Sequence, residues 1–335
     1  MIIISKESLN SERRGIAMKQ LNSENASELQ ATLARAASLK DSKIPVCMGY
    51  VEDKLIAVPV IANTLDYSED KKISGYIELS EGAERIPAGS TVTVKSIDTI
   101  EHIQNTILFI GSHDPLVDEI TKMLTRKNSP YILASAHVGS MGGIHAIRRG
   151  EAHLAGIHLL NEKDGSYNRS FIKKYFSDGS VSLIECVGRT QGMMVVKKNP
   201  KNITGISDLC NQQIRYVNRQ KGSGTRILFD YLCKKDGIDT SFINGYEHEE
   251  FTHNDVARLI ADGLADAGMG VHSAAKLYNL DFIPIYNEQY DLLIPNEMLK
   301  HPGIQEIINI LKSEEFAEKA AMLGGYTLNK PGLPR

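Results

Sequence analysis

The chain has 335 residues and contains little of several residue types that carry recognisable chemistry. It has no tryptophan, aromatic residues make up 6%, and only four cysteines are present, at positions 47, 186, 210 and 233. None of the four forms a C-x-x-C pair, so the sequence predicts reduced thiols rather than a zinc or redox motif. No apolar run approaches the roughly 20 residues that cross a bilayer, so no membrane span is predicted.

An excess of charge of either sign is also missing. Lys and Arg total 38 against 41 for Asp and Glu, a formal net charge of −3. This balance argues against direct nucleic-acid binding, which usually requires a basic face. The apolar opening Met1–Ile4 is shorter than the apolar core of a secretory signal, about 7–15 residues, so we expect a cytoplasmic protein.

The hydrophobic pattern changes near residue 104, which predicts two domains at 1–104 and 105–335. In the first, Leu29, Leu33 and Ala36 recur at helical spacing, so a helix is expected over residues 26–39. From Ile44 onward the apolar runs are short and separated by turn-forming residues at 52–54, 81–83 and 87–90. This pattern predicts a small, mainly β barrel or sandwich.

In the second domain, apolar runs alternate with helical stretches, which indicates an α/β domain and leads us to expect a mainly parallel sheet. The strand-like runs lie at 107–110, 131–134, 154–160 and 282–285. The expected helices cover 115–127, 141–149, 224–235, 254–263, 273–278 and 305–322, the last with a break near Ser313.

Three loops of this domain place glycine and a hydroxyl residue between a strand and a helix, at 111–115, 139–143 and 222–226. Free backbone N–H groups and the helix dipole make such loops suitable for an anion. Helix capping is the ordinary alternative for any one of them. Three in one α/β domain favour a ligand site, because ligands bind at the carboxyl ends of the strands. None is a P-loop or a dinucleotide-binding motif.

The candidate ligand-binding residues combine the hydroxyls of these loops with cationic and phenolic donors. Arginine suits an oxyanion through its planar fork, although each arginine could instead pair with a carboxylate such as Asp266 or Glu151. Tyr167 could instead pack in the core, and His113 could instead have a surface role. The candidates are Ser112, His113, Ser140, Tyr167, Arg189, Arg219, Ser223, Thr225 and Arg226.

Metal, cofactor and catalytic sites are not predicted. The pairs His153/His158 and His248/His253 are five residues apart, which is not the spacing that places two imidazoles on one helix face. Ser112 is adjacent to His113, and neighbouring side chains generally point apart. No G-x-S-x-G elbow occurs, so no catalytic residue is assigned.

From residue 107 onward the chain resembles the periplasmic-binding-protein-like domain attached to MoeA-type molybdopterin biosynthesis proteins and to molybdate-responsive regulators. The resemblance implies a two-lobed type II fold, with one lobe at 105–190 plus 287–335 and the other at 191–286. It also implies that Ser112 and Ser140 face Ser223 and Thr225 across a cleft, and that the ligand is molybdate or tungstate. The matching stretches are 111–114, 138–140, 150–159, 167–168, 189–192, 217–226, 265–268 and 290–292.

The segments 57–59, 75–79 and 88–94 resemble the C-terminal β-barrel domain of MoeA. The larger MoeA domains do not precede them, so metal insertion by this chain alone is not expected. The resemblance predicts a cytoplasmic oxyanion-binding protein for sensing, storage or delivery in molybdenum-cofactor biosynthesis, with proteins of that pathway as partners and a homodimer left open. One alternative is a subunit of cofactor assembly, catalytic or not, that binds a pterin or another phosphorylated ligand. Another is a purely structural interaction module.

Overall fold

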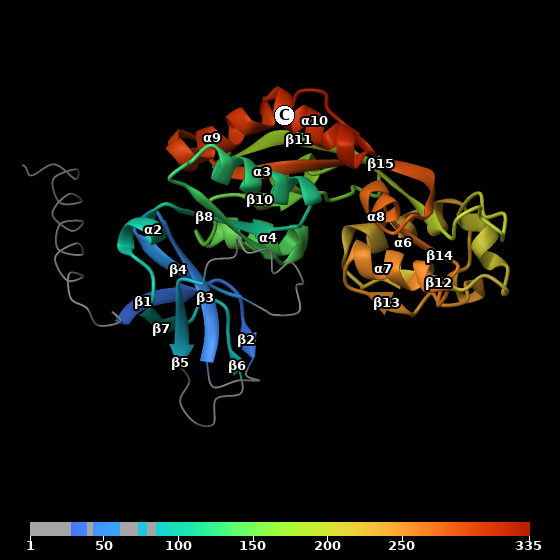
Figure 1. Cartoon of the computed structure of the whole chain (residues 1–335), viewed down its shortest axis with the longest axis horizontal. Helices are drawn as coiled ribbons and strands as arrows, with labels where there is room; N and C mark the ends of the chain where they lie inside the picture. The colour runs from blue at the N-terminus through green and yellow to red at the C-terminus, as the bar shows by residue number, and fades with distance from the viewer. Residues whose placement is uncertain (1–27, 39–42, 61–72, 79–84) are drawn as a thin grey trace, which may run out of the picture. The chain divides into compact units, whose positions relative to one another are not determined.

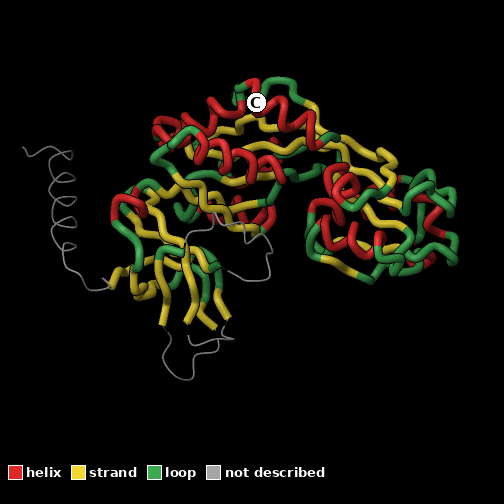
Figure 2. The backbone as a smooth tube through the Cα atoms, in the orientation of Figure 1, coloured by secondary structure: helices red, strands yellow, loops and turns green. Residues whose placement is uncertain are grey.

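The computed structural model describes residues 28–38, 43–60, 73–78 and 85–335. The chain divides into two compact units (Figures 1 and 2). The first unit comprises Met1–Phe109, Asn128–Ala136 and Arg149–Ala152, and the second comprises the remaining residues. Among the described residues, no helix combines the length and the apolar character needed to span a membrane.

The first unit is built on a closed five-stranded barrel, which confirms the predicted β domain (Figure 1). Apolar side chains alternate along its strands and fill the interior, among them Val46, Met48, Ile77 and Val94. In barrel order the strands are β1 (Glu28–Leu33), β4 (Lys54–Pro59), β3 (Lys43–Val51), β5 (Gly75–Glu78) and β7 (Thr91–Ser96). Outside the barrel, β2 (Ala37–Ser38) pairs with β6 (Arg85–Ile86), and α2 (Ile100–Gln104) follows β7.

The helix expected over residues 26–39 is wrong for the described part of that range, because Glu28–Leu33 is a strand. Leu29 and Leu33 are four residues apart, which fits a helix, but Ala31 between them makes the same set fit an alternating strand. Leu29 pairs with Val94 of β7 in register, and this antiparallel ladder helps close the barrel. Pairing with a distant strand therefore decided between two periodicities that the local sequence allows. The turn expected at 81–83 lies outside the described residues.

The main sheet of the second unit is organised by two strands of 15 residues each, β11 (Val181–Val195) and β15 (Asp281–Pro295), which pair antiparallel along their length. The sheet order is β10 (Ala155–Ile157), β15, β11, β14 (Ala267–Val271), β12 (Tyr216–Arg219) and β13 (Glu249–Glu250), and β16 (Tyr326–Thr327) also pairs with β11. Only the β12–β14 and β12–β13 pairs are parallel, so the expectation of a mainly parallel sheet is wrong. The alternation of strands and helices in the sequence does not show the direction in which the strands pair. Here the two long strands pair antiparallel and set the direction of most of the sheet.

The helices lie close to their predicted positions, and the two-lobed α/β fold is confirmed (Figure 1). Ser313 breaks the last helical stretch because its hydroxyl accepts a hydrogen bond from Phe316 N and caps the next helix. The helices are α3 (Pro115–Arg126), α4 (Gly139–Arg148), α5 (Arg169–Tyr175), α6 (Gly224–Lys235), α7 (His253–Ala261), α8 (His272–Leu277), α9 (Pro302–Leu311) and α10 (Glu314–Leu323). The remaining paired strands, β8 (Thr106–Gly111) and β9 (Ile132–His137), form a two-stranded sheet, and short 3-10 helices lie at Ile206–Cys210, Thr240–Phe242 and Asn296–Lys300.

Candidate functional site

Three helices begin just after the three parallel strands of the sheet. In chain order α6 follows β12, α7 follows β13, and α8 follows β14. Because the carboxyl ends of parallel strands share one edge of a sheet, the amino ends of these helices are brought to that same edge. Unpaired N–H groups and helix dipoles make such an edge electropositive. The predicted loop at 222–226 is part of it.

Arg219 ends β12 at this edge and is buried, with only 9% of its surface exposed. Alternation along the strand places Arg219 on the same face as Val217, which packs against Val256 of α7. Arg219 Nη2 donates to the Phe251 carbonyl at 2.9 Å, whereas its Nε has no hydrogen-bond partner. Among the described residues it forms no ion pair. Burial, followed by the charge of Arg189, lowers the pKa of Arg219 to about 10.

His253, the first residue of α7, lies in the same electrostatic neighbourhood. Its Nδ1 is buried and has no hydrogen-bond partner. Burial lowers the pKa of His253 well below its ordinary value, and the charges of Arg219, Arg189, His158 and His113 lower it further. We call these five residues the cationic cluster, after its two arginines. A negatively charged ligand beside Arg219 would relieve the repulsion that lowers the pKa of His253.

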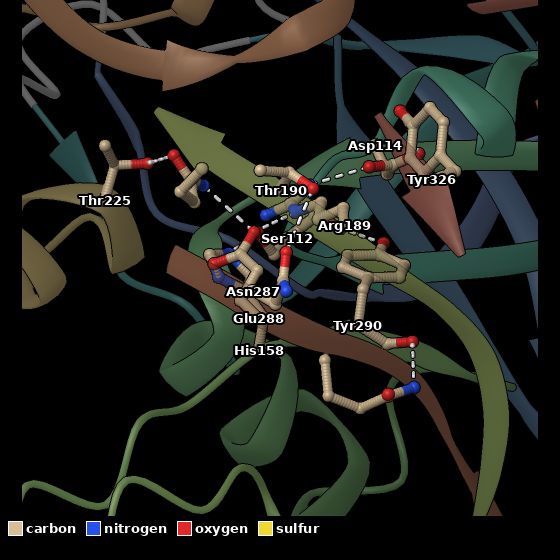
Figure 3. Close-up of polar contacts among 12 residues, drawn as sticks. Ser112, Asp114, His158, Arg189, Thr190, Thr225, Asn287, Glu288, Tyr290 and Tyr326 are labelled. Carbon is tan, nitrogen blue, oxygen red and sulfur yellow. Dashed lines mark hydrogen bonds and ion pairs between the residues drawn. The ribbon is translucent and has the colours of Figure 1, made fainter. Parts of the chain in front are cut away.

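His158 connects two of the predicted loops. Ser112 Oγ lies 2.7 Å from His158 Nε2 (Figure 3). The backbone N–H of His158 donates to Ser140 Oγ at 3.0 Å. The other ring nitrogen of His158 lies 3.2 Å from Glu288 Oε2. The loops at 111–115 and 139–143 therefore meet at His158, the first at its imidazole and the second at its backbone N–H, and Glu288 of β15 contacts the other ring nitrogen.

Arg189 binds two buried carboxylates, one of which, Glu288, also contacts this imidazole. Its Nη1 donates to Asp114 Oδ2 at 2.7 Å, and its Nε donates to Glu288 Oε1 (Figure 3). Gln191 Nε2 also donates to Glu288 Oε1, at 2.9 Å. Burial alone would raise the pKa of Glu288, but the charges of Arg189 and His158 outweigh it and lower that pKa to about 2. Glu288 is thus ionised, and both carboxylates already accept hydrogen bonds from donors.

The amino end of α6 lies directly against His158. A Cβ atom added to Gly224, the first residue of the helix, would lie 2.1 Å from His158 Cε1. Only glycine allows the helix backbone to approach the imidazole this closely. The loop at 222–226 therefore reaches the same residue as the loops at 111–115 and 139–143.

We expect Gly224→Ala to disturb this contact. The added methyl group has to displace either the His158 ring or the start of α6, which should lower the free energy of unfolding by about 1–3 kcal/mol. The matched control is Gly205→Ala, because a Cβ there meets nothing within 4 Å and the backbone is extended. Urea unfolding of both variants measures the difference. Equal stability of the two would contradict the close contact.

The four predicted hydroxyls have distinct partners. Ser112 and Ser140 bond to His158, as described above. Ser223 caps α6 by accepting from Arg226 N at 3.2 Å, which is the capping role considered from the sequence. Thr225 Oγ1 donates to Gln191 Oε1 at 3.4 Å, and Gln191 in turn contacts Glu288. All but Ser223 therefore join one network through His158, Gln191 and Glu288.

Among the predicted arginines, Arg219 differs from the other two. Arg189 is committed to Asp114 and Glu288. Arg226 pairs with Asp230 at 2.9 Å and with Glu249 at 3.0 Å. Two of the three predicted arginines thus pair with carboxylates, which was the alternative to ligand binding. Arg219 is the one of the three that a ligand could engage.

The remaining predicted donors are Tyr167 and His113. The Tyr167 hydroxyl is buried without a partner, and burial, with the nearby charge of Glu288, raises its pKa. His113 Nε2 lies 2.9 Å from Asp118 Oδ2, and its ring is 4.1 Å from that of His137. Tyr167 therefore has a free hydrogen-bonding group near the network, whereas one nitrogen of His113 is already engaged.

Sequence reasoning missed His158, His253 and Glu288. The two histidines were weighed only as metal ligands, and the described residues contain no group of three or more His, Cys, Asp or Glu able to hold a metal ion. For His253 the usable signal was its position, because it directly follows Thr252, the residue that caps the helix. Nothing local marks Glu288, since it lies 130 residues from His158 along the chain.

Two lobes crossed by a pair of long antiparallel strands, with polar groups from distant loops gathered on those strands, define a two-lobed ligand-binding domain. Residues 121–312 match the model of the PBP superfamily domain, and the chain belongs to this superfamily. It is 31% identical over 248 residues to the uncharacterized protein YvgK of Bacillus subtilis (strain 168), which covers 73% of this chain and 79% of that protein.

Two further comparisons are consistent with this family. A Clostridium pasteurianum protein, named from the 5' region of a 2Fe-2S ferredoxin gene, is 36% identical over 107 residues, or 32% of this chain and 95% of that protein. The fold is similar to that of a Clostridium perfringens protein described as a phosphate ABC transporter substrate-binding protein with bound phosphate. That match has a TM-score of 0.51 and 16% identity and covers 68% of this chain and all of the other.

Proposed function

We propose that this protein binds a small, fully deprotonated oxyanion, molybdate or tungstate, at the cationic cluster. The observation that carries the proposal is Arg219, a buried guanidinium that pairs with no carboxylate of the described residues and has an unpartnered Nε. A buried charge is costly unless an opposite charge accompanies it. An oxyanion supplies that charge and accepts the free hydrogen bonds of the site.

The protonation state of the network favours an anion that only accepts hydrogen bonds. Hydrogen phosphate carries a proton and needs an acceptor, which a free carboxylate would provide. Here Asp114 accepts from Leu116 N, Tyr326 and Arg189, while Glu288 accepts from Arg189 and Gln191 and lies against His158. Molybdate, tungstate and sulfate need no such acceptor, so we place them above phosphate, the ligand bound in the Clostridium perfringens protein.

The biological role that we propose is sensing, storage or delivery of the oxyanion for molybdenum-cofactor biosynthesis. Its support is the resemblance of the amino-terminal barrel to the MoeA C-terminal domain, together with the closed barrel of the structure. The barrel offers a means of docking to proteins of that pathway. The alternative ligand, a pterin phosphate, is tested in the same experiment.

Calorimetry and thermal unfolding with molybdate, tungstate, sulfate, phosphate and a pterin phosphate test the proposal. At a molybdate concentration of 100 Kd, binding should stabilise the fold by about 2.7 kcal/mol and raise Tm by about 4–6 °C. Phosphate should bind at least about tenfold more weakly than molybdate. If neither molybdate nor tungstate at millimolar concentration stabilises protein shown to be ligand-free, the proposal is wrong. Tighter binding of the pterin phosphate would replace it with the cofactor-assembly alternative.

A further inference from the structure

We infer that His253 sets the charge selectivity of this site: it is neutral when the site is empty and takes up a proton when a dianion binds. The inference rests on the proposed function and specifies how one residue of the cluster contributes to it. His253 is the first residue of α7 and follows the capping residue Thr252. Arg219 Nη2 donates to the carbonyl of Phe251, two residues before His253, and the His253 Nδ1 is buried without a hydrogen-bond partner.

The charges that act on His253 come from several elements and are mainly positive. Arg219 of β12, Arg189 of β11, and His158 and His113 from the loops after β10 and β8 all disfavour its protonation. The adjacent strand β14 contributes only backbone there, since a Cβ on Gly270 would lie 3.3 Å from His253 Nδ1.

Asp255 and Glu288, the carboxylates that act on Arg219, are engaged elsewhere, and Glu250 of β13, which packs against α7, lies 4.0 Å from His248 Nε2. Asp255, on the same helix, accepts from Thr252 Oγ1 at 2.6 Å and lies 3.7 Å from Arg258. Glu288 is occupied by Arg189 and Gln191. Within the described part of the chain, His253 therefore forms no ion pair that would hold a proton on it.

A bound dianion reverses this balance. Arg219 neutralises one of the two negative charges, and the second remains in a buried region where charges interact strongly. Protonation of His253 neutralises the second charge and provides an additional charge-assisted donor. A monoanion is already neutralised by Arg219, so it gains little from the extra proton. The pKa of His253 should thus rise on binding, and affinity for a dianion should rise as pH falls between the free and bound pKa values.

Calorimetry of the full chain with sodium molybdate at pH 7, in two buffers of different ionisation enthalpy, measures the number of protons taken up. We expect a value approaching one, and an affinity that weakens by up to about tenfold per unit as pH rises from 6.5 to 8.5. Perchlorate, a monoanion, should bind more weakly and with no proton uptake. Absence of molybdate binding would overturn the proposed function. Molybdate binding without proton uptake would overturn this inference alone.

His253→Gln identifies the residue responsible, because glutamine keeps hydrogen-bonding groups but cannot be protonated near neutral pH. This variant should lose the proton uptake and bind molybdate about 10- to 100-fold more weakly. His272→Gln is the matched control: His272 also begins a helix and also has a buried, unpartnered Nδ1, but it packs against Gly325 and Phe282. The His272→Gln variant should retain the proton uptake on molybdate binding. Uptake that persists in His253→Gln would refute the assignment.

A second measurement does not depend on how the variant folds. In wild-type protein labelled with 15N-histidine, the ring nitrogen shifts of His253 should change from the neutral to the protonated pattern when molybdate saturates the site. They should remain neutral with perchlorate. A neutral His253 in the molybdate complex would contradict the inference.

Discussion

Arg219→Met is expected to abolish oxyanion binding without destabilising the unliganded protein. Removing one partner of a buried charge pair costs about 2–5 kcal/mol, so molybdate affinity should fall by a factor of about 30 to several thousand. The guanidinium of Arg219 is buried in an environment that lowers its pKa to about 10, and its one side-chain hydrogen bond to the described residues goes to Phe251 O. Methionine fills similar volume without a charge, so the free energy of unfolding should stay the same or increase.

Arg226→Met is the control for this prediction, because Arg226 is equally buried but paired with Asp230 and Glu249. Because those carboxylates are partly exposed, Arg226→Met should lower the free energy of unfolding only moderately, by about 1–3 kcal/mol. Urea unfolding and molybdate calorimetry on both variants give the comparison. Arg219→Met with normal molybdate affinity and a larger stability loss than Arg226→Met would show that Arg219 is structural.

Arg189→Met should have the largest effect on stability. The substitution leaves Asp114 and Glu288 buried without their shared cation, and breaking a buried ion pair in this way costs about 3–5 kcal/mol. Urea unfolding measures this loss. Asp114→Asn and Glu288→Gln added to Arg189→Met should recover part of it, because the remaining groups are then neutral. Failure of the triple variant to regain any stability would mean that the guanidinium acts through packing rather than charge.

The pH dependence of the same proteins gives an independent check. In the wild type the pKa of Glu288 is lowered from 4.5 to about 2, so its contribution to stability is present above pH 4.5 and is lost as pH falls toward 2. Without Arg189, burial dominates and the folded-state pKa should lie above 4.5. Arg189→Met should therefore gain stability between pH 7 and pH 5, and its deficit relative to wild type should shrink. A deficit independent of pH would contradict the ion-pair role.

The position of the site was predictable to the extent that it depends on local chemistry. Glycine, hydroxyl residues and a following helix identified the loops that contain Ser112, Ser140 and Gly224, and all three loops reach His158. The partners of individual side chains were not predictable in the same way. Arg189, Arg219 and Arg226 look alike in the sequence, and only long-range contacts show that two of them are paired with carboxylates.

The sequence by itself determined which segments form strands and helices in the second unit, the barrel character of the first, and the loops that present anion donors. These depend on periodicity and turn chemistry within a few residues. Tertiary structure decided that Glu28–Leu33 is a strand, that β11 and β15 pair antiparallel, and that Arg219 Nε and His253 Nδ1 are buried with no partner among the described residues. Each of these depends on residues far apart in the chain, whose pairing and burial no local pattern encodes.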